Sequence, residues 1–106
     1  MKKLSLVYVT TSSKAEADKI GRTLLEKKLC ACINVWGGME STYWWEGKLE
    51  TAQEWVLLIK APAEKVETIL PLIKATHSYT TPCVMAWDID RGSPEYMEWL
   101  HRTTQE

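Results

Sequence analysis

The sequence lacks the features that mark a membrane-spanning protein or a nucleic-acid-binding protein. Its 106 residues contain no run of 18 apolar residues, the length that a membrane-spanning helix needs. Neither sign of charge is in excess, since 13 Lys and Arg residues stand against 14 Asp and Glu residues. Proteins that bind nucleic acid or a membrane surface usually carry a clear basic excess. We therefore expect no nucleic-acid or membrane partner, which leaves metal ions, small molecules and other proteins.

Cysteine is scarce, and the amino terminus has no pattern of a secretion signal. The chain has three cysteines, and the apolar run after Lys3 is too short for a signal-peptide core. These features predict a cytoplasmic protein with free thiols. We expect residues 1–106 to form one domain, because a chain of this length can bury a core without disulfides or a structural metal.

The local motifs of the common enzyme classes are also absent. The chain has no C-x-x-C, no H-E-x-x-H, no G-x-S-x-G, no P-loop and no G-x-G-x-x-G. These motifs mark redox or zinc sites, zinc proteases, serine hydrolases, nucleotide sites and dinucleotide sites. We therefore expect a protein that is not an enzyme.

Hydrophobic periodicity predicts the element order β-α-β-β-α-β, followed by one more helix. The predicted strands cover residues 4–10, 30–45, 49–60 and 83–89. The predicted helices begin after Ser13, where Glu16 completes a capping-box pattern, near Pro62 and at Pro94. This order predicts an α+β sandwich with helices on one face of a mixed sheet.

Glycine and proline predict where these elements bend. Gly37-Gly38 predicts a bulge in the second strand, and Glu46-Gly47-Lys48 predicts the tight turn of a long hairpin. Pro71 lies inside the second helix pattern, which it should kink or interrupt because it lacks an N–H. In the last helix the residues expected to face inward are Tyr96, Trp99 and Leu100.

Aromatic residues are the most unusual part of the composition, with six Trp, four Tyr and no Phe. Tyr43, Trp44 and Trp45 follow one another near the end of the predicted hairpin, and Trp55 lies on the partner strand. Alternate side chains of a strand point to opposite faces, so both faces of the hairpin carry rings. A two-stranded ribbon cannot bury both faces by itself. The rings either form a subunit interface or cover helices of their own domain, and we favour the interface.

Histidine and cysteine supply the candidate ligands. His77 lies in a polar connector among hydroxyl groups, where it is either a ligand or proton carrier or the carboxyl-terminal cap of the preceding helix. Cys30 and Cys32 lie on one face of a predicted strand, where they either chelate a soft ion such as Cu(I) or fill the core. A nucleophile-and-base pair of Cys83 and His77 would have to be assembled by the fold.

Four blocks of the sequence resemble the CutA divalent-cation-tolerance family in order and spacing. These blocks are residues 29–34, 41–48, 77–82 and 92–100. The most specific parts are the A-C-x-N strand, the W-E-G-K turn and the closing G-x-P-x-Y-x-x-W-L helix. The resemblance implies a ferredoxin-like fold similar to that of PII signalling proteins, and a tight homotrimer assembled through the long hairpins. It also implies divalent-metal or copper binding and a cytoplasmic role in metal tolerance.

The connector departs from the family pattern H-P-Y-E-x-P-E. In place of the proline and both glutamates the chain has Ser78, Thr80 and Cys83. Some members also carry a cysteine at the end of the first strand and a second histidine, where this chain has Val9-Thr10 and Thr76. His77 is therefore the one metal ligand that the resemblance carries over.

The sequence thus favours a homotrimeric, non-enzymatic protein that binds divalent cations, copper among them, through His77 with help from Cys83. The alternative is a PII-like regulatory module that binds a small ligand in the clefts between subunits. An acylphosphatase-type enzyme would need a glycine-rich phosphate loop with an arginine, whereas residues 10–14 supply hydroxyl groups and one lysine.

Overall fold

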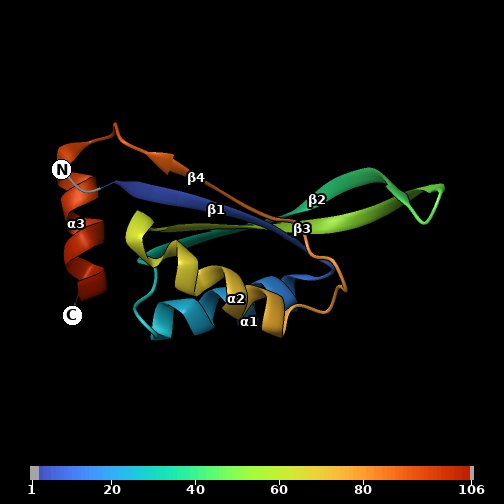
Figure 1. Ribbon diagram of the computed structural model, residues 1–106, viewed down its shortest axis with the longest axis horizontal. Helices are drawn as coiled ribbons and strands as arrows, with labels where there is room; N and C mark the ends of the chain where they lie inside the picture. Colours follow the sequence, from blue (N-terminus) through green and yellow to red (C-terminus); the bar gives the residue numbers. More distant parts are fainter. Residues whose placement is uncertain (1–2, 106) are drawn as a thin grey trace.

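The computed structural model, which describes residues 3–105, is a four-stranded sheet with two helices under one face and a third helix at one end (Figure 1). The elements are β1 (Leu4–Thr11), α1 (Lys14–Glu26), β2 (Cys32–Trp45), β3 (Lys48–Pro62), a short 3-10 turn (Ala63–Lys65), α2 (Val66–Thr76), β4 (Val84–Ile89) and α3 (Pro94–Gln105). No helix within residues 3–105 is long and apolar enough to cross a membrane.

The strands follow the order β2-β3-β1-β4, and every neighbouring pair is antiparallel. This is the ferredoxin-like arrangement, so the predicted α+β class and element order are confirmed. The prediction of a mixed sheet is wrong. The connection through α1 returns β2 parallel to β1, but β3 lies between these two strands and pairs antiparallel with both.

The core lies between the sheet and the two helices α1 and α2. Val7 and Val9 of β1 pair with Ile59 and Leu57 of β3, and all four side chains are fully buried. They pack against the buried faces of the helices, to which Ile20, Leu24, Ile69 and Ile73 contribute. Full burial of one such side chain stabilises the fold by about 1.5–3 kcal/mol.

The second helix tolerates a proline in its interior. α2 runs through Pro71 without interruption, although the missing N–H removes one hydrogen bond of the helix. Ile69 and Ile73, on either side of it in sequence, are both fully buried in the core. Their packing holds the helix together at the position where the sequence alone predicted a kink or an interruption.

The last helix packs across the end of the sheet, at the opposite end of the molecule from the hairpin tip (Figure 1). It buries Met97 and Leu100 against Leu4. The expected inward orientation of Tyr96 and Trp99 is wrong, because both remain partly exposed. The reason is that α3 packs against the rest of the chain mainly through one narrow row of side chains, which includes Met97 and Leu100.

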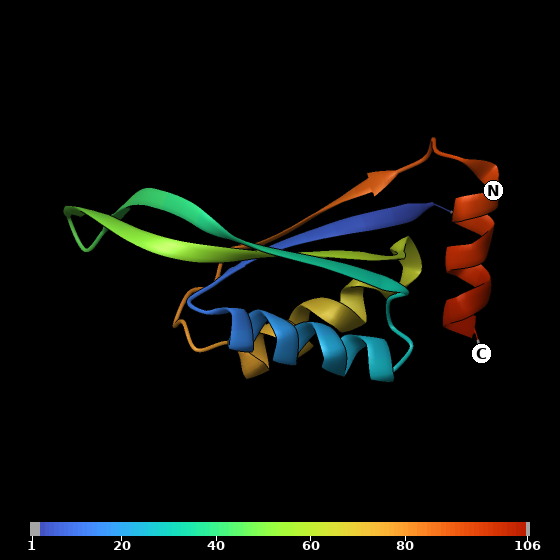
Figure 2. The ribbon, with the colours of Figure 1, turned by 180° about the vertical axis from the view of Figure 1, so that it is seen from behind.

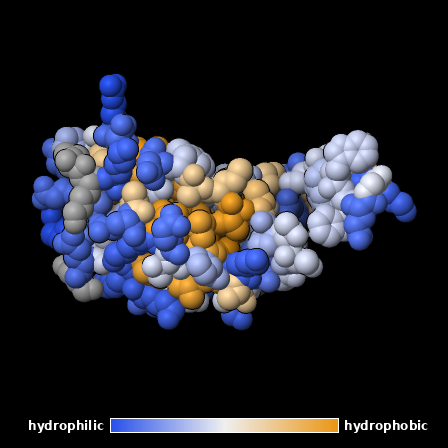
Figure 3. All heavy atoms as spheres, viewed as in Figure 1, coloured by the Kyte–Doolittle hydropathy of each residue, from blue (hydrophilic) through white to orange (hydrophobic). Residues whose placement is uncertain are grey.

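The β2–β3 hairpin protrudes from the body and gives the molecule a long axis of 45 Å (Figures 1 and 2). Trp45 pairs with Lys48, so Glu46 and Gly47 form a two-residue turn with φ values of 49° and 80°. Two positive φ values are typical of the type I′ turn that matches the twist of a hairpin. The predicted tight turn is therefore confirmed. Figure 3 shows hydrophobic residues gathered on the body, while the protruding hairpin is pale to blue.

The predicted bulge is confirmed by a register shift between Trp36 and Met39. A Cβ on Gly37 would lie 2.6 Å from the ring of Trp55, so only glycine fits beside that ring. Beyond this register shift, the alternation of β2 side chains between the two faces of the sheet is offset by one residue. The shift thereby turns the end of the hairpin relative to the rest of the sheet.

The other face of the sheet carries no helix, as the reverse view shows (Figure 2). Three large apolar side chains lie exposed on this helix-free face: Trp36, Met85 and Trp87. Met85 lies opposite Tyr8 and Trp87 lies opposite Leu6 in the register of β4 and β1. A sheet face of this character normally meets a second layer of protein.

Candidate functional site

The site predicted from the sequence lies where the connector, residues 77–83, passes the end of β1. The connector leaves α2 and leads into β4 (Figure 1). The N–H of Thr10 donates to the carbonyl oxygen of Cys83 at 3.4 Å, and the imidazole of His77 reaches the carbonyl oxygen of Thr10 at 2.7 Å. Both predicted ligands are thus held against one residue of β1.

The side chain of His77 is fully buried, and both of its ring nitrogens are engaged. Nε2 lies 2.7 Å from the Thr10 carbonyl oxygen, and Nδ1 accepts a hydrogen bond from the N–H of Tyr79 at 3.0 Å. Because a carbonyl oxygen can only accept, these partners assign the proton to Nε2. The backbone N–H of His77 also bonds to Ile73, so the alternative prediction that His77 caps α2 is confirmed.

Glu16 ties the connector to the amino-terminal end of α1. Its carboxylate accepts hydrogen bonds from the N–H of Ser12 at 3.1 Å and the N–H of Ser78 at 2.7 Å, and it lies 3.7 Å from Nδ1 of His77. Burial alone would raise the pKa of Glu16, but these hydrogen bonds, with that of the Ser78 hydroxyl, lower the pKa from 4.5 to about 2. The capping box with Ser13 is therefore only half formed, because Glu16 bonds to Ser12 and Ser78 instead.

Tyr79 connects the connector to the hairpin. Its ring lies against the imidazole of His77, with the ring centres 4.7 Å apart. Its hydroxyl donates to Oε2 of Glu54 on β3 at 2.9 Å. Glu54 is only 7% exposed, so this hydrogen bond joins the connector to a buried residue of the hairpin. Burial and the hydrogen bond to Glu54 raise the pKa of Tyr79 above its ordinary value of 10.0.

A groove of about 740 Å³ lies between the connector and the hairpin. Tyr8, Glu54, Tyr79 and Cys83 line its inner part, and Trp45 lines its outer part. Burial, followed by the charge of Glu54, raises the pKa of the Cys83 thiol, while a hydrogen bond with Thr10 opposes this shift. Burial and the charges of Cys83 and Glu54 likewise raise the pKa of Tyr8. The inner groove therefore disfavours additional negative charge.

The described residues form no preformed metal-binding site. Within residues 3–105 no three His, Cys, Asp or Glu side chains are grouped so that they could hold a metal ion. The two ring nitrogens of His77 are occupied as described, so the residue presents no free lone pair. The residues as placed thus do not fit a preformed metal centre.

The other two cysteines differ from each other in environment. Cys30 is 1% exposed and belongs to the core, so the core-filling interpretation is correct for this residue. Burial, with the nearby Cys32, raises its pKa from 9.0 to about 12. Cys32 begins β2 on the helix-free face, whereas Cys30 precedes the strand. The two thiols therefore do not form the exposed pair that Cu(I) chelation would need.

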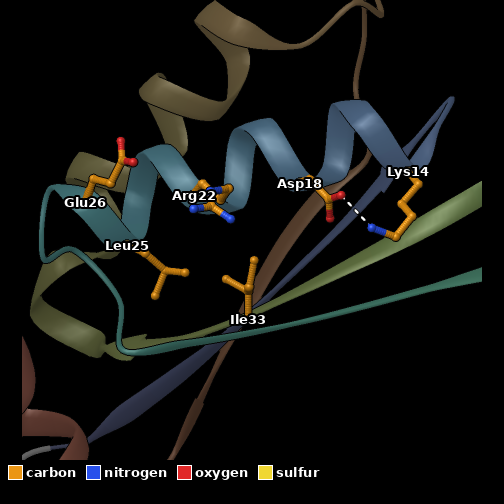
Figure 4. A pocket seen from close by; sticks show the side chains of 6 residues that line it. All are labelled: Lys14, Asp18, Arg22, Leu25, Glu26 and Ile33. Carbon is orange, nitrogen blue, oxygen red and sulfur yellow. Dashed lines mark hydrogen bonds and ion pairs between the residues drawn. The ribbon is translucent and has the colours of Figure 1, made fainter.

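A second hollow lies on the other side of the molecule, between α1 and the edge strand β2 (Figure 4). Leu25 of α1 and Ile33 of β2 form its apolar part, and Lys14 pairs with Asp18 at its rim. Arg22 and Glu26 extend along the same side of α1. Charges of both signs alternate here, as on an ordinary solvated helix face.

Comparison with known proteins identifies the family. The model of the CutA1 divalent ion tolerance protein family matches residues 5–103. The chain belongs to this family. The divalent-cation tolerance protein CutA of Archaeoglobus fulgidus is 43% identical over 101 residues, which are 95% of this chain and 98% of that protein.

Other members of the CutA1 family extend the comparison. The solved structure of the periplasmic divalent cation tolerance protein CutA from Archaeoglobus fulgidus superposes with a TM-score of 0.91 at 42% identity, covering 95% of this chain and 98% of that chain. The chloroplastic CutA 1 of Oryza sativa is 39% identical over 95% of this chain, which spans 57% of that protein. Members of the family are therefore named for more than one compartment.

The sequence indicates His77 and Cys83 as site residues but does not indicate Glu16 and Glu54. The spacing of Glu16 from Ser13 matches the local pattern of a helix cap, which hides its contact with the connector. Glu54 lies in a strand of mixed polarity, and nothing local indicates that its side chain is buried. Its position on β3, directly opposite Met39 beyond the bulge, brings it under the connector. Only the tertiary fold creates that proximity.

Proposed function

We propose that this member of the CutA1 family is a homotrimer that packs through the helix-free sheet face and the hairpins. The observation that carries this proposal is the uncovered sheet face bearing Trp36, Met85 and Trp87. The hairpin adds Trp44, which is 71% exposed. Exposed apolar surface of this extent on a folded chain usually marks association with another protein surface.

We propose further that the protein binds divalent cations, copper among them, and acts in cation tolerance without being an enzyme. Family membership supports the cation, and the convergence of His77 and Cys83 on Thr10 supports these two residues as the ligands to test. Ligation by His77 requires that the hydrogen bond from Tyr79 to Nδ1 opens. One imidazole and one thiol are too few for a closed site, so we expect a modest affinity.

Calorimetric titration with Cu(II) and Zn(II), and with Cu(I) under reducing conditions, tests this part of the proposal. We expect His77→Ala to weaken the binding of Cu(II) and Zn(II), and Cys83→Ser to weaken the binding of Cu(I) more than that of Zn(II), because thiolates prefer soft ions. Cys32→Ser is the matched control, since that thiol lies outside the groove. Unchanged titrations for His77→Ala and Cys83→Ser would exclude these two residues as ligands.

A PII-like regulatory role is the second candidate, and the groove between the connector and the hairpin favours it. Its volume of about 740 Å³ suits a small organic ligand.

We also propose that residues 1–106 act as a single domain and that the protein is cytoplasmic, in keeping with its free cysteines.

A further inference from the structure

We propose that residues 78–79 of the connector are an autoinhibitory latch, which keeps a cation off Nδ1 of His77 until the latch opens. This inference rests on the proposed role of His77 as a cation ligand and adds the segment that regulates it. Three features support it: two consecutive N–H groups over the site, a carbonyl group that fixes the imidazole, and an anchor of the latch on β3.

The first feature is the pair of consecutive backbone N–H groups. The N–H of Ser78 donates to Oε2 of Glu16 at 2.7 Å. The N–H of Tyr79 donates to Nδ1 of His77 at 3.0 Å. The two acceptor atoms lie 3.7 Å apart, so a cation on Nδ1 would take the place of the two N–H groups beside the carboxylate. The closed latch and a bound cation therefore exclude each other.

The second feature is the fixed orientation of the imidazole. Nε2 lies 2.7 Å from the carbonyl oxygen of Thr10, which leaves the lone pair of His77 on Nδ1. Metal-binding histidines commonly donate their other ring N–H to a carbonyl oxygen in this way. Nδ1 faces Glu16 of α1, and α1 lies on the opposite side of the sheet from the helix-free face (Figure 2). Departure of the Tyr79 N–H would thus free Nδ1 without a change of tautomer and away from the proposed subunit contact.

The third feature is the anchor of the latch. The hydroxyl of Tyr79 donates to Oε2 of Glu54 on β3 at 2.9 Å, and the ring of Tyr79 lies against the imidazole of His77. Glu54 is buried, so water does not readily replace this hydrogen bond. We therefore expect the bond between Tyr79 and Glu54 to hold the latch closed.

Two variants weaken the latch at different points. Ser78→Pro removes the N–H donor to Glu16, and the preceding residue, His77, already has the extended backbone that a following proline requires, with φ −79° and ψ 143°. Tyr79→Phe removes the anchoring hydroxyl and keeps the ring. Ser78→Ala is the matched control for the first variant, because it keeps the N–H. Tyr96→Phe is the control for the second, because it removes a hydroxyl from α3.

The experiment combines two measurements on the intact protein. NMR measures the protection of the residue 79 amide against hydrogen exchange in the absence of metal, and calorimetry measures the zinc affinity that His77→Ala abolishes. Opening of the latch exposes the amide and Nδ1 together, so both measurements report the same equilibrium. We expect Ser78→Pro and Tyr79→Phe to lower the protection about fivefold to tenfold and to raise the zinc affinity by the same factor.

The controls fix how these results are read. Tyr96→Phe should change neither quantity, and Ser78→Ala should change both less than Ser78→Pro does. Unchanged protection of the residue 79 amide in both latch variants would overturn the latch. Zinc binding that depends on His77 but is equal in the wild type and both latch variants would also overturn it, and would leave the cation function standing. Absence of zinc binding in every variant would overturn the cation function of His77 and the latch with it.

Discussion

At the scale of single residues, Ser78 shows how a departure from the family pattern creates a new contact. The family pattern has proline at this position, and proline has no N–H to donate. Here the N–H of Ser78 donates to Glu16 at 2.7 Å and ties the connector to α1. Serine at this position thus supplies a hydrogen bond to Glu16 that proline could not form.

Glu16→Gln tests how much this hydrogen bond between the connector and α1 contributes to stability. We expect the variant to lose about 1–3 kcal/mol of unfolding free energy at pH 7, because hydrogen bonds to a charged acceptor are lost. The folded pKa of Glu16 is lowered from 4.5 to about 2, so the carboxylate stabilises the fold fully above pH 4.5 and loses this effect as pH falls toward 2. Urea unfolding at pH 7 and at pH 3 measures the difference.

The matched control for this change is Glu67→Gln, which removes an exposed carboxylate from α2. It should change stability by a few tenths of a kcal/mol at most. An equal loss in both variants would contradict a special role for Glu16. A gap between wild type and Glu16→Gln that does not shrink at pH 3 would contradict it as well.

The thiol of Cys83 predicts how any metal affinity of this site depends on pH. Its pKa is raised, so at pH 7 the thiol is protonated and must lose its proton to act as a ligand. We expect Cu(I) affinity to increase from pH 7 to pH 9 in the wild type. Cys83→Ser should flatten that dependence in the same titration. An equally steep pH dependence in Cys83→Ser would assign it to another group.

At the scale of elements, Lys65 joins three segments that are distant in sequence. Its ammonium group donates to the carbonyl oxygen of Lys28, just after α1, at 2.9 Å and to that of Thr104 in α3 at 2.6 Å. Carbonyl groups at the ends of helices lack partners within the helix, and a cation is well suited to them. Lys65 therefore holds α3 against the body.

Lys65→Met should remove these contacts while keeping the length of the side chain. We expect a loss of about 1–2 kcal/mol in unfolding free energy and faster hydrogen exchange in α3 than in α1. Lys74→Met, at an exposed position of α2, is the control and should have little effect. If α3 exchanges at the same rate in both variants, Lys65 does not hold it.

The elements were largely predictable from the sequence, because strands and helices each have their own hydrophobic period. The turn at Gly47 and the bulge near Gly37 were predictable for the same local reason, since glycine is needed there. The uninterrupted α2 was not, because tertiary packing of Ile69 and Ile73 outweighs the effect of Pro71. Hydrophobic periodicity does not predict the strand order, since pairing between distant strands leaves no local signal; the ferredoxin-like arrangement was implied by the family resemblance.

The candidate site, too, was only partly predictable from the sequence. His77 and Cys83 could be found because their residue types and the connector pattern are local features. Their surroundings could not, since Thr10 and Glu16 beside His77 and Glu54 near Cys83 come from three other elements. Whether a histidine offers a free nitrogen depends on those distant partners.

At the scale of the whole molecule, the helix-free face decides how the chain associates. Trp87→Glu places a carboxylate at the centre of the proposed contact, where an unpaired buried charge costs several kcal/mol. We expect the variant to dissociate or to fall to a smaller assembly in sedimentation velocity. Thr68→Glu, which adds the same charge on α2, should leave the assembly intact. Identical sedimentation of both variants would place Trp87 outside the contact.

The mass of the purified wild-type protein in solution, determined by light scattering at micromolar concentration, tests the homotrimer. We expect a mass three times that of the 12.2 kDa chain. Three copies would cover the apolar sheet faces and the hairpin rings that one copy leaves exposed. A mass of 12.2 kDa that persists as concentration rises would contradict the homotrimer.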